Sequence, residues 1–218
     1  MKKCIAFVAS LAIAGLCFAK NHSCGIDIVA GFPLGFSRYS LEDNLADDAK
    51  LKFTELGFGM KIQTYDCFLL GGILGVYASA GFGVGFAVQT EKEESLILND
   101  GGTYVSGDFL IGPAVGFDAG ALRFQMGVAF HAVVLKMNSF LYEGDSKKFH
   151  SFGFALTPQV RFTADKRCSF VVGADLMFDF PQKMSNTDSF GVTTDSDWKN
   201  SFRFGLTPYL GLGINFGK

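Results

Sequence analysis

The sequence has little proline, tryptophan or charge: of its 218 residues, 5 are Pro, 1 is Trp and 18% are charged. It has no run of basic residues that could neutralise phosphates, so we expect no nucleic-acid partner. It has no Cys-x-x-Cys pair and no cluster of His with Cys, so we expect no metal site, and nothing else in it calls for a cofactor. The 19 basic and 21 acidic residues leave a formal net charge of −2, which indicates no particular partner.

Glycine and phenylalanine are both abundant, with 27 Gly and 25 Phe. Gly normally makes up about 7% of a chain. Each Gly in a helix interior costs roughly 1 kcal/mol relative to Ala, so long helices are disfavoured. The glycines follow no three-residue period, which excludes collagen, and the hydrophobic content of 49% excludes a disordered chain. The fold must therefore accommodate many Gly and many Phe residues without long helices.

The first segment has the pattern of a secretory signal peptide. Met1–Lys3 is basic, and Cys4–Phe18 is uncharged and apolar. Cys17 and Ala19 are small enough for the −3 and −1 positions of a cleavage site. We therefore predict two parts, a signal peptide over residues 1–19 and one barrel domain over residues 20–218.

Two other interpretations of the first segment are open. It could stay as a membrane helix, although the run Cys4–Phe18 is short for a span. It could instead carry a lipid on Cys17, although Leu16 is large for the position before a lipid-bearing cysteine.

The rest of the chain alternates between large apolar and small or polar residues. In Ser201–Lys218 the even positions up to Phe216 carry Phe, Leu, Pro or Ile, and the odd positions carry Gly, Tyr or more polar residues. This period of two predicts a β-strand. Hydropathy alone would make Phe68–Val88 a membrane helix, but its large and tiny residues also sort with period two. Eight strands follow, over residues 26–37, 56–64, 68–89, 108–118, 121–135, 150–164, 169–180 and 201–218.

The connections between these strands alternate in length. Short turns are expected at residues 65–67, 118–120 and 165–167. Long polar connections are expected at residues 40–51, 90–103, 137–149 and 182–198. Short turns at one end and long loops at the other are typical of an up-and-down barrel in an outer membrane.

The composition of the two strand faces predicts which of them points inward. One face is Gly, Ala, Ser and Thr with few charges, which suits the narrow interior of an eight-stranded barrel. The other is Phe, Leu and Val, which suits hydrocarbon. We predict an all-β fold: an eight-stranded antiparallel up-and-down transmembrane β-barrel with short periplasmic turns and longer extracellular loops. Aromatic girdles are expected near the strand ends, at Tyr39, Tyr65, Phe68, Tyr104, Phe117, Tyr142, Phe149, Phe170, Trp198 and Phe216.

With this architecture the chain resembles the small eight-stranded outer-membrane barrels of bacteria, of the OmpX, OmpW and opacity types. The resemblance covers the whole mature chain. Its most specific part is the end of the last strand, which looks like the signal read by the barrel-assembly machinery at Tyr209, Gly211, Ile214 and Phe216. Gly217 and Lys218 follow Phe216, which departs from that pattern. The resemblance implies a bacterial outer-membrane location, with outer-membrane lipid and the assembly machinery as partners.

Charged side chains at inward positions are the candidate site of the barrel lumen. Opposite charges in a closed lumen should pair, because an unpaired buried charge is costly. We expect a structural polar cluster that plugs the barrel. The alternative is a constriction that selects small solutes. The cluster comprises Asp27, Lys61, Arg123, His131, Arg161, Asp175, Asp179 and Arg203.

No catalytic residue is predicted. His150 and Ser151 are adjacent, but neighbours on a strand point to opposite faces and cannot form a dyad. His131 faces inward, where a polar-core role is expected. The cysteines of the mature chain all lie on the short-turn side, and we predict a Cys24–Cys67 disulfide with Cys168 free.

The functional prediction is a non-enzymatic outer-membrane protein whose surface-exposed loops interact with the environment or a host surface molecule. One alternative is an OmpW-like channel for a small hydrophobic ligand. The other is an exported soluble barrel that binds lipid, with its apolar faces turned inward.

Overall fold

The computed structural model describes residues 24–41, 49–70, 72–89, 102–139, 144–163, 167–197 and 201–216. The predicted signal peptide, residues 1–19, lies outside them. Within these ranges there is no helix long and apolar enough to cross a membrane. The elements are β1 (Cys24–Gly31), β2 (Leu34–Leu41), β3 (Ala49–Leu69), β4 (Leu74–Gln89), β5 (Gly102–Ala119), β6 (Leu122–Ser139), β7 (Ser146–Thr163), β8 (Cys168–Thr187), β9 (Thr193–Asp197) and β10 (Phe202–Phe216).

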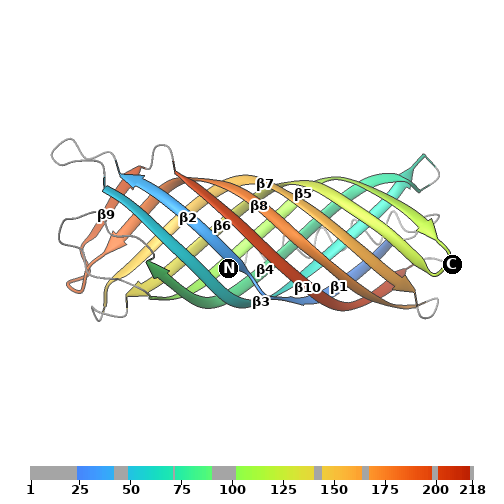
Figure 1. The fold of residues 1–218 in the computed structure, drawn as a ribbon, viewed down its shortest axis with the longest axis horizontal. Coiled ribbons are helices and arrows are strands. Elements are labelled where there is room, and N and C mark those ends of the chain that lie inside the picture. Colours follow the sequence, from blue (N-terminus) through green and yellow to red (C-terminus); the bar gives the residue numbers. More distant parts are fainter. Residues whose placement is uncertain are drawn as a thin grey trace.

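The strands close into a ring of eight, as predicted (Figure 1). β1 and β2 are two halves of one strand, because both pair with β3 on one side and with β10 on the other. β3 to β8 follow in antiparallel order, and β10 pairs with β8 to complete the ring. β9 pairs with the end of β8, and the hairpin that they form extends beyond the ring at the end that holds the longer connections.

The strand at β1 and β2 is interrupted at Phe32–Pro33. β1 ends with Gly31 opposite Gly59, and β2 resumes with Leu34 opposite Leu56. Proline has no N–H to donate to a neighbouring strand, so it breaks the ladder. The gap is bridged by two backbone bonds: Phe32 N donates to Pro208 O at 3.0 Å, and Gly57 N donates to Pro33 O at 2.9 Å.

The first turn lies later in the chain than predicted. The sequence predicted a turn at residues 65–67, but Tyr65 and Asp66 continue β3 and pair with Tyr77 and Val76 of β4. The chain reverses after Leu69 instead. Leu70 and Gly72 there have φ values of 50° and 91°, a conformation that Gly adopts without strain. The uncharged run at 68–89 is therefore a turn followed by β4. The turn predicted at 118–120 also lies slightly later, at residues 120–121, because Asp118 and Ala119 still pair with Arg123 and Leu122. Gly120 in that turn has a φ value of 67°.

The outward faces of the ring strands form a continuous apolar surface, which we call the apolar band. On β7, Phe154 and Leu156 are 61% and 40% exposed, whereas the intervening Ala155 and the following Thr157 are 1% and 0% exposed. The prediction of apolar residues outside and small or polar residues inside is confirmed. The band includes Ile28, Phe36, Leu56, Phe58, Met60, Ile62, Phe82, Val84, Phe86, Met126, Val128, Phe130, Val134, Phe152, Phe154, Leu156, Phe178, Phe180, Leu210, Leu212 and Ile214.

Glycines on the inward face make space for the large side chains of the lumen. A Cβ added at Gly173 would lie 2.5 Å from the Tyr209 hydroxyl oxygen. One added at Gly127 would lie 2.5 Å from Thr157 Oγ1 and 3.0 Å from the Tyr77 side chain. Lumen tyrosines therefore fit only because these neighbours lack side chains.

The predicted aromatic girdles are correct only in part. Phe117 and Phe170 point outward, 60% and 43% exposed. Tyr65, Tyr104 and Phe149 lie inside the barrel, 1%, 2% and 3% exposed. They occupy inward positions of their strands, and closeness to a strand end does not change the face on which a residue lies. The remaining predicted girdle side chains lie outside the described part of the chain.

Candidate functional site

The lumen holds a polar network built from most strands of the ring. Seven of the predicted lumen residues are buried: Asp27, Lys61, His131, Arg161, Asp175, Asp179 and Arg203. The network has three layers along the barrel axis. Hydrogen bonds join the first two layers, and apolar side chains close the network on the loop side.

The layer nearest the short turns centres on Arg161 of β7. Its Nη2 donates to both carboxylate oxygens of Asp27, at 2.6 and 2.7 Å. Its Nη1 donates to Ser169 Oγ at 3.1 Å and to Asn215 Oδ1 at 2.7 Å. Asp27 Oδ2 also accepts from Gln63 Nε2 at 3.3 Å. Asp27 lies on β1, so this layer ties the first strand to β7 and β10.

The middle layer centres on Lys61 of β3. Its ammonium lies 2.5 Å from Asp175 Oδ2 of β8 and donates to the Tyr77 hydroxyl at 3.2 Å. It also sits 3.9 Å from the ring centroid of Tyr209, a cation–π distance. The rings of Tyr65 and Tyr77 pack beside it, tilted by 42° with centroids 4.4 Å apart.

A row of glutamine amides connects these two layers. Gln63 Nε2 donates to Gln159 Oε1 at 2.6 Å, and Gln159 Nε2 donates to Gln125 Oε1 at 2.7 Å. The Tyr209 hydroxyl donates to the same Gln159 oxygen at 3.3 Å. The row joins β3, β6, β7 and β10 inside the barrel. Each side chain of the row is hydrogen-bonded to at least one other.

The third layer is held by Arg203 of β10. Its Nη2 lies 2.8 Å from Glu55 Oε2, and its Nη1 lies 2.9 Å from Asp179 Oδ2. The other Asp179 oxygen lies 2.6 Å from His131 Nδ1. Glu55 also accepts from Ser37 Oγ at 3.2 Å. The sequence reasoning missed Glu55, because the strand was predicted to begin one residue after it.

An apolar cluster lies at the loop-side end of the network. Phe53, Tyr104 and Phe149 are buried inside the strand ends, with exposures of 2–4%. Ala87, Leu135 and Met137 complete the cluster. The polar layers are therefore covered by packed side chains where the lumen approaches the longer connections.

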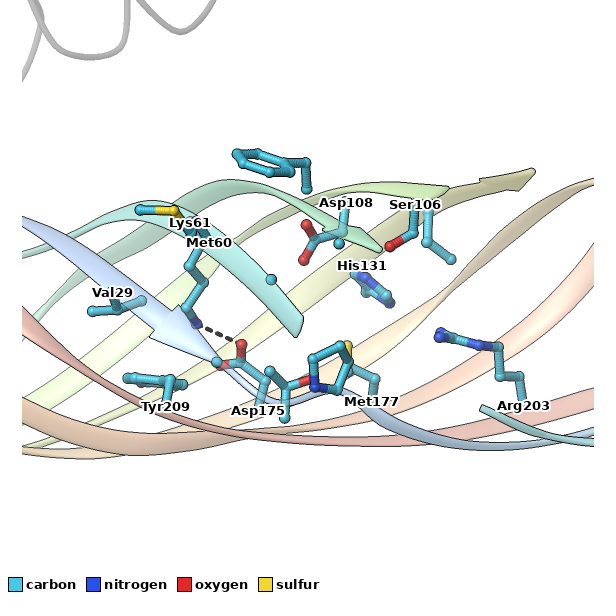
Figure 2. Close-up of a pocket in the computed structure, with 17 residues that line it drawn as sticks. Val29, Met60, Lys61, Ser106, Asp108, His131, Asp175, Met177, Arg203 and Tyr209 are labelled. Atoms are coloured by element: carbon cyan, nitrogen blue, oxygen red, sulfur yellow. Dashed lines mark hydrogen bonds and ion pairs between the residues drawn. The ribbon is translucent and has the colours of Figure 1, made fainter. Parts of the chain in front are cut away.

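The cavity beside Lys61 and Asp175 is small. Figure 2 shows a cavity with Lys61 and Asp175 on one side and Asp108 and His131 on the other. Its volume is about 50 Å³, which is space for water but not for a metabolite. His131 Nε2 and Asp175 Oδ1 are buried there without a hydrogen-bond partner.

Arg123 is the one predicted lumen residue that does not join the network. Its Nη1 lies 2.8 Å from Asp118 Oδ2, and the Asp118 side chain is 67% exposed. Its Nη2 donates to Gly72 O at 2.8 Å. Arg123 therefore ties the β5–β6 turn to the β3–β4 turn at the short-turn mouth. The prediction placed it in the polar cluster because its inward position was known but its height along the barrel was not.

The predicted Cys24–Cys67 disulfide is not formed. Cys67 is a free, buried thiol, and Cys168 is free and exposed. The register pairs Cys24 with Asp66, the neighbour of Cys67. Adjacent strand residues point to opposite faces, so the buried Cys67 thiol lies on the other face of β3 from Asp66, the residue directly opposite Cys24. The prediction used closeness in the sheet and overlooked this alternation.

The proposed assembly signal lies on β10, the strand that closes the ring. Tyr209 is buried in the lumen, and Gly211 is also on the inward face. Ile214 is 54% exposed on the outward face. Phe216 is the last residue of β10 and pairs with Cys24. Recognition by the assembly machinery stays a prediction.

The described His and Ser side chains that could pair lie deep in the lumen or on separate faces of the wall. His131 and Asp179 form the closest His–Asp pair, but both side chains are fully buried. Ser151 is buried inside, whereas His150 is on the outer face, as their adjacency predicted. Among the residues that the structure describes, no group of three or more His, Cys, Asp and Glu side chains is arranged to hold a metal ion.

Solved structures share this architecture at low sequence identity. The outer-membrane protein OprG from Pseudomonas aeruginosa is 13% identical, covering 91% of this chain and 98% of its own, with a TM-score of 0.57. The outer-membrane protease OmpT from Escherichia coli is 8% identical, with coverages of 91% and 98% and a TM-score of 0.54. A major outer-membrane protein from Thermus thermophilus is 12% identical, with coverages of 86% and 99% and a TM-score of 0.51.

The sequence itself matches no protein-family model and no curated protein. The likeness is therefore one of fold alone, which in this chain is a closed antiparallel ring. The chain has the fold of the small bacterial outer-membrane β-barrel proteins.

Proposed function

We propose that the protein is an integral outer-membrane barrel with a closed lumen and no enzymatic activity, whose loop side contacts the environment or a host surface molecule. The observation that carries the proposal is the network across the lumen. Arg203 joins Glu55 of β3 to Asp179 of β8, and Lys61 joins β3 to Asp175 of β8. Such pairs, with the glutamine row and the apolar cluster, support a plug rather than a pore.

The apolar band supports insertion in a bilayer. On β7 the outward apolar residues run from Phe152 to Phe162, with exposures of 47% and 46% at the two ends. A strand that crosses a membrane needs about 9–11 residues. Polar side chains would cover this surface if the barrel were a soluble carrier. Resistance to carbonate extraction, and a gel migration that changes on boiling, are the results expected of the membrane protein.

The hairpin of β8 and β9 offers a built surface beyond the band. Its tip exposes Phe190 and Val192, at 90% and 60%. The Asp188 carboxylate accepts from the backbone N–H groups of both residues, at 3.0 and 2.8 Å. Two apolar side chains held out by a defined turn suit contact with another surface. Binding of cells that carry wild-type protein or Phe190→Ser/Val192→Ser to an immobilised host-cell extract would test this contact.

Conductance tests the closed lumen directly. Purified protein in a planar bilayer should give no defined channel steps. A regular open conductance in the wild type would contradict the plug. The proposed loop-side contact would still stand in that case, because cell binding tests it and conductance does not.

A channel for small hydrophobic molecules is the second candidate, and one observation favours it. The cavity of Figure 2 is lined by Met60 and Phe82 of the apolar band as well as by Lys61 and Asp175 of the lumen. It lies beside the β1–β2 interruption at Pro33. Uptake of a small aromatic dye into liposomes would support this candidate if the protein accelerates it while ionic conductance stays absent.

A further inference from the structure

A group of basic side chains faces outward where the apolar band ends on the loop side. On β6, Val134 is the last exposed apolar residue and Lys136 is the next outward residue. On β7, Phe152 is followed outward by His150 and Lys148. On β8, Lys183 lies beyond Phe180. Lys136, Lys148, His150 and Lys183 form what we call the basic cluster.

The strand register brings the members of the basic cluster together. Lys136 is directly opposite Lys148, and His150 is directly opposite Lys183. Residues directly opposite each other on one face have Cβ atoms about 4.5–5.5 Å apart, and like charges at such positions are destabilising. The arrangement therefore costs stability unless an anion lies between the two lysines.

The protein itself supplies little negative charge at this place. No described outward position of β6, β7 or β8 carries a carboxylate. Lys183 lies 2.6 Å from Asp195 of β9, with both side chains about half exposed, and is directly opposite Asp197. These two acidic residues belong to β9, which pairs with β8 and not with β6 or β7, the strands of Lys136 and Lys148. Burial, and next the charges of Lys148 and Lys183, lower the pKa of the His150 imidazole below its ordinary value. The cluster is thus a local region of positive potential.

We propose that the basic cluster binds the phosphate group of an anionic lipid in the loop-side leaflet. Lys136 and Lys148 are the primary contacts, and His150 and Lys183 flank them. The proposal rests on the membrane location proposed above. The band places Phe130, Val134 and Phe152 directly below the cluster, where the acyl chains of such a lipid would lie. Basic residues at the edge of a hydrocarbon layer attract anionic headgroups in this way.

The test measures lipid selectivity of the full barrel in phosphatidylcholine bilayers. Electron spin resonance reports how strongly spin-labelled phosphatidic acid associates with the protein relative to spin-labelled phosphatidylcholine. The wild type should prefer phosphatidic acid. Lys136→Gln/Lys148→Gln should weaken that association roughly tenfold. The charge-keeping variant Lys136→Arg/Lys148→Arg should retain it.

Arg167 provides a control, because it is an exposed basic residue at the short-turn end of the barrel, away from the basic cluster. Arg167→Gln should leave the selectivity unchanged. Equal selectivity in the wild type and in Lys136→Gln/Lys148→Gln would overturn the proposal. Loss of the preference on adding millimolar inorganic phosphate would also overturn it, because the cluster would then be a site for free phosphate.

Folding and insertion are checked in the same samples by gel migration before and after boiling. A folded, inserted Lys136→Gln/Lys148→Gln barrel without selectivity is the expected result. If the wild type fails to insert, the membrane location fails and the lipid site falls with it. If it inserts but shows no selectivity, only the lipid site falls.

Discussion

Lys61 and Asp175 form an ion pair across the lumen, with 2.5 Å between the ammonium nitrogen and the carboxylate oxygen. β3 and β8, which carry them, are separated in the ring by the β1–β2 strand and by β10. The pair therefore braces parts of the wall that share no backbone hydrogen bonds. The side chains are only 7% and 2% exposed, so bulk solvent does not replace either partner.

This pair predicts an asymmetry between single and double substitutions. Lys61→Met alone leaves Asp175 as an uncompensated buried charge and should lower the free energy of unfolding by about 3–5 kcal/mol. Lys61→Met with Asp175→Leu removes both charges and should cost much less. Urea titration of the folded protein in bilayers measures both. Equal losses would show that the pair is not coupled.

A second prediction concerns the plug. Arg203→Ala removes the side chain that connects Glu55 to Asp179 and leaves two carboxylates in the lumen. We expect intermittent cation conductance in a planar bilayer, where the wild type is silent. Arg123→Ala is the control, because Arg123 ties two turns together at the lumen mouth. Conductance of the same size in both variants would argue against a plug held by Arg203.

A third prediction concerns glycine. Gly173→Ala puts a Cβ 2.5 Å from the Tyr209 hydroxyl oxygen and 2.7 Å from the Pro158 carbonyl oxygen. Overpacking of this kind should cost about 1–3 kcal/mol. Gly107→Ala is the matched control, because a Cβ at Gly107 meets no atom within 4 Å. The same unfolding titration should show a loss for Gly173→Ala and nearly none for Gly107→Ala.

The pH response of His150 gives a fourth prediction. Burial, Lys148 and Lys183 lower its pKa, Asp195 acts in the opposite direction, and its partner on β6 is the apolar Val134. Because the folded pKa is lowered, the neutral imidazole is favoured. The free energy of unfolding is therefore not reduced by His150 at pH values above the pKa of His150 in the unfolded chain. It falls as the pH drops through that pKa towards the lower pKa of His150 in the folded protein.

A bound lipid phosphate should raise the pKa of His150. Nuclear magnetic resonance titration of the imidazole, in neutral micelles with and without phosphatidic acid, measures the change. Lys136→Gln/Lys148→Gln should abolish the upward shift. An unchanged titration of the wild type on adding phosphatidic acid would contradict a phosphate beside the ring.

The free thiols give a fifth prediction. Exposed Cys168 should react quickly with a maleimide in the folded protein, and buried Cys67 should react only after unfolding. The folded wild-type barrel and Cys67→Ser should each migrate the same on a gel with and without reductant. If reductant changes the migration of the wild type but not that of Cys67→Ser, Cys67 does form a disulfide and the free-thiol description is wrong.

Alternation in the sequence was sufficient to predict the ring and its orientation. Large apolar residues must face hydrocarbon on every second position, so inward positions such as Asp27, Asp175 and Asp179 could be read from the chain. The height of a side chain along the barrel axis could not be predicted from the sequence. Arg123 and Arg203 are both on inward positions, but only Arg203 lies among carboxylates.

The strand ends were harder to predict than the strand centres. Above the apolar band the outward face no longer needs apolar residues, so the alternation fades while backbone pairing continues. On β3 the outward positions pass from Leu56 to Thr54 and Lys52. The predicted strand therefore stopped at residue 56, and Glu55 was missed. Tyr104 and Phe149 were assigned to the wrong face for a related reason, since aromatic residues near a strand end suit either an interface or a lumen.

The pairing of β10 with β1 and β2 has a consequence for how the chain folds. The first and last strands are neighbours, with Cys24 opposite Phe216, so the ring closes only when both ends of the domain are present. Contacts this distant in sequence make folding slow and strongly cooperative. Without β10, the strands that pair with it would keep unsatisfied N–H and C=O groups along two edges. A chain that stops before Phe202 would therefore form an aggregation-prone open sheet instead of a smaller barrel.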